Sequence, residues 1–167
     1  MVVRILVAYA TRNGSTGEIA HAAGRELSAA GHAVDVAQLK TISTLAGYNA
    51  VVMGGPLYMG SIDGAVGKFV GKYNDQLAHL PVAAFGVGLA PVSKDAKQMV
   101  ESMKALHASV APLQPVAETL FAGKLDPSRL SFIQRKMTEF VKSPVGDFRD
   151  WMAIAAWAKE LPGKMKL

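Results

Sequence analysis

Cysteine is absent from this chain of 167 residues, and aromatic residues make up only 7% of it. Without cysteine, disulfides, thiolate metal sites and thiol catalysis are all excluded. The histidines are scattered, without the spacing of a metal-binding motif. They are His21, His32, His79 and His107. We therefore predict no protein metal site, and we assign no histidine a catalytic role.

Long hydrophobic runs are also missing. The first apolar run, 5–8, breaks into polar residues at Thr11, which is too early for the core of a signal peptide and far too short for a membrane span. We therefore expect a cytoplasmic protein. Hydrophobic residues make up 50% and charged residues 19%, which predicts one globular domain over 1–167. The net charge of +5 mildly favours anionic partners such as lipid head groups, but we predict no nucleic-acid partner.

The chain alternates between two kinds of pattern. Short apolar runs, typical of buried strands, occur at 3–8, 33–37, 50–54, 82–87 and 115–121. Helical spacing separates them at 19–30, 64–78 and 94–106, and a last helix is expected to begin at Asp147 as its N-cap. This alternation predicts an α/β fold with a doubly wound sheet of five parallel strands. The segment 38–48 is too short for a full helix and predicts a loop with at most one turn.

The segment 126–142, between the fifth strand and the last helix, does not fit this alternation. Its start, Asp126-Pro127, is typical of a helix, and apolar residues follow at helical spacing: Leu130, Ile133, Met137, Phe140 and Val141. Its basic residues include Arg129, Arg135, Lys136 and Lys142. We predict an extra amphipathic helix. Over 127–142 it either docks on an anionic membrane or an apolar substrate, or packs on the sheet edge or on a second subunit.

The loop 11–16 directly follows the first strand and precedes the first helix. Its hydroxyls and backbone amides can point at one phosphate, with the positive end of the helix dipole behind them. The P-loop pattern, the G-x-G-x-x-G fingerprint and the G-x-S-x-G elbow are all absent here. An ordinary polar turn is the alternative interpretation.

Two further loops support a ligand site. The third strand ends in 54–61 and the fourth in 87–91, and both loops combine glycine with apolar or aromatic residues. In open α/β sheets, ligands bind beyond the carboxyl ends of the strands, at the point where the strand order reverses. These two loops could sandwich a flat apolar ring while the first loop holds its phosphate.

The segments 9–16 (YATRNGST) and 53–60 (MGGPLYMG) resemble the flavodoxin superfamily. Within it, 80–85, 122–126 and 146–151 resemble the branch that contains menaquinone-dependent protoporphyrinogen dehydrogenase. The resemblance implies the strand order 2-1-3-4-5 and FMN as cofactor, with the phosphate at the first loop and the isoalloxazine ring between the other two. The residues that it assigns to FMN are Thr11, Arg12, Asn13, Gly14, Ser15, Thr16, Pro56, Leu57, Tyr58, Met59, Gly60, Val87, Gly88, Leu89 and Ala90.

Three functions stay open on these grounds. The first is an FMN-dependent oxidoreductase that oxidises a porphyrinogen or exchanges electrons with a quinone. The second is a non-enzymatic electron carrier that docks redox partner proteins, and the net charge of +5 argues against it because flavodoxin shuttles are strongly acidic. The third is a binding module that has lost its cofactor. Peripheral contact with the inner face of a membrane and a homodimer are further hypotheses about partners.

Overall fold

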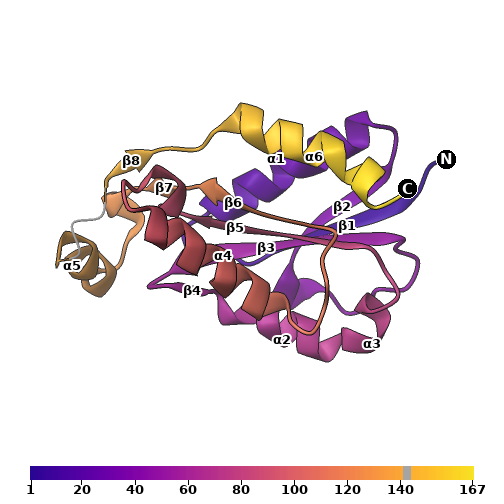
Figure 1. Cartoon of the computed structure of the whole chain (residues 1–167), viewed down its shortest axis with the longest axis horizontal. Coiled ribbons are helices and arrows are strands. Elements are labelled where there is room, and N and C mark those ends of the chain that lie inside the picture. The colour runs from indigo at the N-terminus through magenta and orange to yellow at the C-terminus, as the bar shows by residue number, and fades with distance from the viewer. Residues whose placement is uncertain (141–143) are drawn as a thin grey trace.

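The computed structural model describes residues 1–140 and 144–167 and has an α/β architecture (Figure 1). Within these residues, five strands form a parallel sheet in the order β2-β1-β3-β5-β6. Their bounds are β1 Arg4–Tyr9, β2 Ala33–Gln38, β3 Ala50–Tyr58, β5 Val82–Gly88 and β6 Ala117–Ala122. The short β4, Ser61–Ile62, pairs antiparallel with the end of β3. The predicted order 2-1-3-4-5 is confirmed, because β5 and β6 are the fourth and fifth parallel strands.

Helices cover both faces of this sheet (Figure 1). On one face lie α1 (Ser15–Ala29) and α6 (Trp151–Lys164), and on the other lie α2 (Gly64–Lys72), α3 (Asn74–Leu77) and α4 (Ala96–Val110). The single helix predicted over 64–78 is divided at Tyr73, between α2 and α3. The predicted loop after β2 holds one 3-10 turn, Leu39–Thr41.

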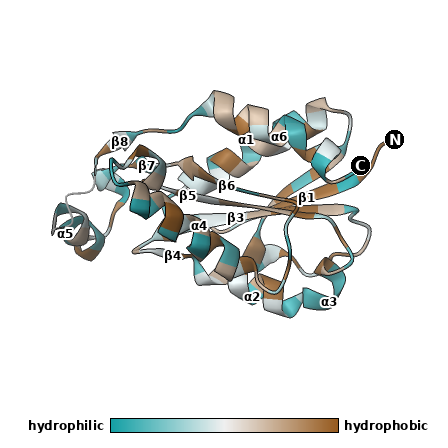
Figure 2. Cartoon of the chain, in the orientation of Figure 1, coloured by the Kyte–Doolittle hydropathy of each residue, from teal (hydrophilic) through white to brown (hydrophobic). Residues whose placement is uncertain are grey.

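The core consists of two layers, one on each side of the sheet. In β1, Leu6 and Ala8 pack in the layer under α2 and α4, whereas Ile5 and Val7 pack in the layer under α1 and α6. Both faces of each central strand are therefore buried, which explains the continuous apolar runs in the sequence. Figure 2 shows the same arrangement, with β1 in brown beneath helices of mixed colour.

The chain departs from the alternation after β6, at the carboxyl edge of the sheet (Figure 1). A two-stranded ribbon pairs β7 (Lys124–Leu125) with β8 (Gly146–Asp147). Between these strands lie a 3-10 turn, Pro127–Arg129, and the helix α5, Phe132–Phe140. We call residues 126–140 and 144–145 the insertion.

The helix predicted over 126–142 is shorter than expected and starts later. The side chain of Asp126 accepts a hydrogen bond from the N–H of Ser128 at 3.0 Å and so caps the 3-10 turn instead. A capping box begins α5: the N–H of Gln134 donates to Oγ of Ser131 at 3.2 Å, and the N–H of Ser131 donates to Oε1 of Gln134 at 3.0 Å. Val141, Lys142 and the side chain of Phe140 lie outside the residues that the structure describes.

The apolar residues of the insertion do not form the single stripe that the sequence predicts. Leu130 is buried and Met137 is half-buried, whereas Phe132 and Ile133 are 72% and 70% exposed. The insertion therefore packs one apolar side inward and presents another to the surface. Among the described residues, no helix combines the length and the apolar composition needed to cross a bilayer.

The start of α6 also differs from the prediction, because Arg149 takes the carboxylate that was expected to cap the helix. The Arg149 side chain is 7% exposed, and its guanidinium binds both carboxylate oxygens of Asp147, at 2.8 and 2.6 Å. It also pairs with Glu18 of α1 and lies over the ring of Trp151, 4.6 Å from the centroid. Asp150 caps α6 instead, accepting from the N–H of Ala153 at 2.9 Å. Trp151, the first residue of α6, is 43% exposed.

This ion pair predicts a specific loss of stability in acid. The hydrogen-bonded Arg149 guanidinium lowers the pKa of Asp147 to about 2. Because the folded chain favours the carboxylate more than the unfolded chain does, the stabilisation is present above about pH 4 and is lost as the pH falls toward about 2. Between these pH values, the urea midpoint of the wild-type chain should fall more steeply than that of Asp147→Asn.

The matched control is Asp75→Asn, which changes an exposed carboxylate in the first turn of α3. It should keep the wild-type pH profile. Parallel profiles for the wild type and Asp147→Asn would mean that the Arg149–Asp147 pair contributes nothing to stability in solution.

Candidate functional site

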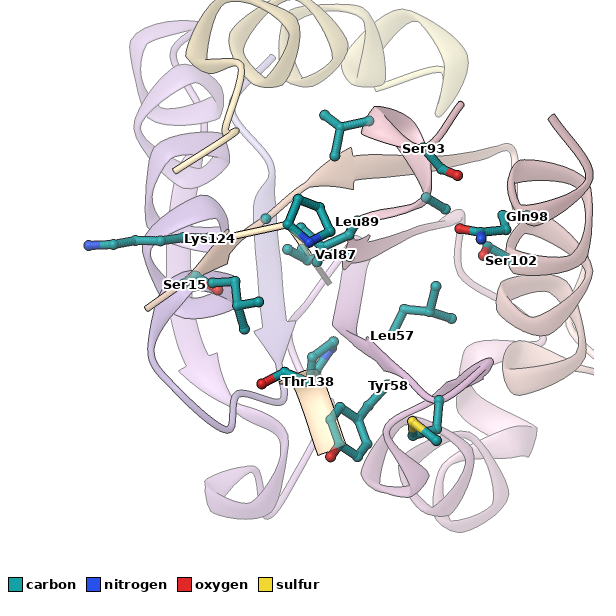
Figure 3. Close-up of a pocket in the computed structure, with 18 of the residues that line it drawn as sticks. Ser15, Leu57, Tyr58, Val87, Leu89, Ser93, Gln98, Ser102, Lys124 and Thr138 are labelled. Atoms are coloured by element: carbon teal, nitrogen blue, oxygen red, sulfur yellow. The ribbon is translucent and has the colours of Figure 1, made fainter. Parts of the chain in front are cut away.

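A cavity of about 800 Å³ opens at the carboxyl edge of the sheet (Figure 3). Three loops surround it, one after β1, one between β3 and β4, and one after β5, because parallel strands end at the same edge. Of the residues predicted for the site, the following line the cavity: Arg12, Asn13, Ser15, Thr16, Pro56, Leu57, Tyr58, Met59, Gly60, Val87, Gly88, Leu89 and Ala90. Thr11 and Gly14 do not line it, and they shape the first loop instead.

The first loop is a tight turn that leads straight into α1. The N–H of Gly14 donates to the hydroxyl of Thr11 at 2.9 Å, and Gly14 has a φ of 94°, which a residue with a side chain rarely adopts. Ser15 and Thr16 follow as the first residues of α1, with Thr16 only 1% exposed. The turn therefore brings two hydroxyls and the start of a helix to one end of the cavity.

Among residues 1–140 and 144–167, no side chain caps the N-terminus of α1, since glycine stands at its N-cap position. By contrast, α2, α4 and α6 are each capped by the carboxylate of an aspartate, namely Asp63, Asp95 and Asp150. The first N–H groups of any helix lack partners within the helix. At α1 these groups and the positive end of the helix dipole face the cavity, where they suit an anion.

The second loop is a two-residue hairpin turn between β3 and β4. Met59 and Gly60 form it with φ values of 50° and 79°, and Leu57 and Tyr58 pair with Ile62 and Ser61. Two positive φ values in succession define a type I′ turn, which is unusual for methionine. The turn holds Leu57 and Tyr58 against the cavity, and it leaves Met59 61% exposed at the rim.

Arg12 connects the first loop to the second. Its Nε donates to Oδ2 of Asp63 at 3.0 Å, and its guanidinium lies 5.0 Å from the ring centroid of Tyr58. Burial raises the pKa of Asp63, but hydrogen bonds from the N–H of Ala65 and from Arg12 outweigh it, so the net pKa is below its ordinary value. Asp63 therefore stays ionised, and the charge of Arg12 is compensated within the protein.

The insertion covers the cavity and contacts both loops. Arg129 donates from Nη1 to the carbonyl oxygen of Asn13 at 3.2 Å, and the hydroxyl of Tyr58 lies 3.8 Å from Sδ of Met137. Further lining residues from this part of the chain are Lys124, Leu125, Leu130, Met137, Thr138 and Pro144. Sequence reasoning missed these residues, since helical periodicity identifies a shared face but not the surface that the face meets.

The wall opposite α1 is polar, and it was also missed. Ser93, Gln98 and Ser102 lie on this side, while Leu57, Val87 and Leu89 lie between them and Ser15 (Figure 3). One signal in the sequence could have indicated this wall. Ser102 is a polar residue in the buried stripe of α4 that also contains Leu106 and Val110. The cavity thus has two polar ends and an apolar middle.

Comparisons with known proteins agree with this architecture. The model of the "Flavodoxin domain" family matches residues 6–151. The chain is similar to protoporphyrinogen IX dehydrogenase [quinone] of Escherichia coli strain K12, with 27% identity over 95% of this chain and 94% of the relative.

Among solved structures, the fold is similar to that of a flavodoxin from the domain Archaea, with a TM-score of 0.57 and 17% identity over 99% of this chain and 100% of the other. It is also similar to a Fusobacterium nucleatum flavodoxin variant bound to flavin mononucleotide, with a TM-score of 0.52 and 16% identity over 71% and 68% of the two chains. At these identities the similarity to solved structures supports the fold.

Proposed function

The chain belongs to the flavodoxin-domain family, and from that premise we propose that it is an FMN-dependent oxidoreductase made of a single domain over 1–167. The observation that carries the proposal is the uncapped N-terminus of α1, which opens with Ser15 and Thr16 into a cavity whose middle is apolar. An amphiphile with one anionic end fits such a cavity. The Fusobacterium nucleatum flavodoxin variant with a similar fold is bound to FMN in its solved structure.

The residues around the cavity fit this cofactor. Ser15, Thr16 and the first amides of α1 would hold the phosphate, with Thr11 and Gly14 shaping the turn. Tyr58 of the second loop and Leu89 of the third would face the ring, since a flat aromatic partner gains from stacking and apolar contact. FMN supplies the transfer of electrons and protons, while the protein supplies position and electrostatic environment.

For the substrates, we propose a porphyrinogen as the hydrogen donor and a quinone as the acceptor. The porphyrinogen loses three electron pairs and six protons to become the porphyrin, and three quinones each take up one electron pair and two protons to become quinols. Two observations support this choice over a carrier: the name of the Escherichia coli relative, and the net charge of +5, which differs from that of acidic shuttles.

Contact with an anionic membrane surface belongs to the same proposal. Phe132 and Ile133 are exposed at the start of α5, and Arg135 and Lys136 follow them after Gln134. Apolar side chains flanked by basic ones suit the boundary between head groups and acyl chains, where quinones reside. The wild-type chain should co-sediment with anionic liposomes, and the variant Phe132→Ser/Ile133→Ser should not. Equal co-sedimentation of the wild type and this variant would contradict the membrane contact.

Absorption and turnover test the proposed function. The purified chain should be yellow and should release FMN on denaturation. With excess protoporphyrinogen and menadione under anaerobic conditions, it should show saturable steady-state kinetics that the FMN-free chain lacks. An FMN-loaded chain without saturable kinetics would be a carrier, and a chain that binds no FMN would be a binding module.

A further inference from the structure

The polar wall opposite α1 contains a buried hydroxyl that faces the cavity. Ser102 is 6% exposed and lies one turn before Leu106 on the inward face of α4. Figure 3 shows Ser102 beside Gln98, both projecting from α4 toward the cavity. The next two turns of this stripe carry Leu106 and Val110, so the packing of α4 alone does not require a serine here.

The hydroxyl of Ser102 is free to bind a ligand. Two other helical hydroxyls bond the backbone of their own helix: Ser109 donates to the carbonyl of Leu106 at 2.7 Å, and Thr138 donates to that of Arg135 at 2.8 Å. For Ser102, no hydrogen-bond partner is present among residues 1–140 and 144–167. Among the described residues, the buried side-chain atoms without a partner are Nδ1 of His32 and Oδ1 of Asn74. The Ser102 hydroxyl is not one of them, because it opens onto the cavity, where a ligand group can bond it.

The chemistry of this wall indicates a neutral ligand group with both donors and acceptors. A serine hydroxyl and a glutamine amide each donate and accept. Lys94 and Glu101 lie at the same end with opposite charges, so this wall has no net charge to select an anion. The opposite end of the cavity, at Ser15 and Thr16, is the end suited to a phosphate.

We propose that Ser102, with Gln98 one turn before it, hydrogen-bonds the pyrimidine edge of the flavin ring. This edge alternates neutral carbonyl acceptors with an N–H donor, and the apolar middle of the cavity, at Leu57, Val87 and Leu89, separates it from the phosphate end. The inference rests on the proposed function. The burial of Ser102 in the wall of the cavity favours the cofactor as its partner over a diffusing substrate.

The test compares Ser102→Ala with Ser109→Ala in the full-length chain stripped of FMN. Loss of one neutral hydrogen bond should weaken binding of FMN and of riboflavin alike, by about three- to tenfold, since the ring is common to both. Ser109→Ala should leave both dissociation constants unchanged, because that hydroxyl bonds the helix backbone. Quenching of flavin fluorescence measures all of these constants.

Stability of the FMN-free chain separates a binding role from a structural one. Ser102→Ala removes a hydroxyl without a partner in the described structure and adds a better helix former, so the urea midpoint should stay equal or rise. A lower midpoint in Ser102→Ala would overturn the proposal in favour of a packing role. Unchanged flavin binding with a raised KM for menadione would overturn it too, by assigning the wall to the substrate. With either of these outcomes, tight FMN binding by the wild type would still support the proposed function.

Discussion

Replacing Ser15 and Thr16 by alanine should weaken FMN binding by about 2 to 4 kcal/mol, or about 30- to 700-fold, and leave riboflavin binding almost unchanged. Each hydroxyl lies at the uncapped start of α1 and lines the cavity, so each can donate to a phosphate oxygen. Hydrogen bonds to a charged group contribute about 1.5 to 3 kcal/mol each, and neighbouring ones are less than additive. Calorimetric titration of the FMN-free chain measures the constants.

Ser28→Ala is the matched control, because it removes an exposed hydroxyl near the other end of the same helix. It should bind both flavins as the wild type does. If the double variant bound riboflavin as poorly as FMN, the hydroxyls would act on the ring or on the fold. Full FMN affinity in the double variant would place the phosphate elsewhere.

Binding of FMN and of riboflavin distinguishes the two ends of the cavity. Variants at Ser15 and Thr16 should separate FMN from riboflavin, whereas Ser102→Ala should weaken both to the same degree. The two sets of constants together therefore test the direction in which the cofactor lies, from α1 toward α4. A reversed pattern would reverse that direction.

Strand positions and the location of the three loops could be predicted from the sequence for a physical reason. A strand buried on both faces must be apolar at successive positions, as 50–54 is, and few other elements of that length look the same. Once the strands are parallel, their carboxyl ends share an edge, so 11–16, 54–61 and 87–91 must converge. The convergence of these three loops can therefore be predicted from the topology alone, without knowing how the side chains pack.

The remaining parts of the site depend on tertiary contacts that leave no periodic signal. Both Asp147 and Asp150 are good N-caps, and the decision between them is made by Arg149, which binds Asp147 together with Glu18 of a distant helix. In the same way, the spacing of Leu130, Ile133 and Met137 suggests one face. The late start of α5, at the Ser131–Gln134 capping box, leaves Ile133 exposed.

Gly54 shows how a residue interpreted as part of a loop can be a packing requirement. The sequence placed it at the end of the third strand, but β3 continues to Tyr58, and Gly54 lies opposite Phe85 of β5. A glycine within a strand often marks a close approach of another group. Here a Cβ atom would lie 2.3 to 2.4 Å from three carbons of the Phe85 ring.

Gly54→Ala should therefore lower the free energy of unfolding by about 3 kcal/mol, at the upper end of the usual cost of overpacking a core. Phe85 cannot move aside easily, because it is fully buried and its ring packs against Phe121 and Trp157, with centroids 5.9 and 6.1 Å away. Urea unfolding measures the change. Gly71→Ala in α2 is the control: a Cβ there meets nothing within 4 Å, so the helix should gain about 0.5 to 1 kcal/mol.

A double-mutant cycle identifies the ring as the cause. Phe85→Leu alone should destabilise the chain by leaving a cavity, but in the Gly54→Ala background it should remove the clash. The double variant should then be more stable than the sum of the two single changes predicts, by at least about 1 kcal/mol. Strict additivity would mean that Gly54 is needed for its backbone conformation and not for the space it leaves to Phe85. Because Pro56 and Leu57 line the cavity and follow Gly54 closely on the same strand, a strand displaced by the clash should also weaken FMN binding, and Phe85→Leu should restore it.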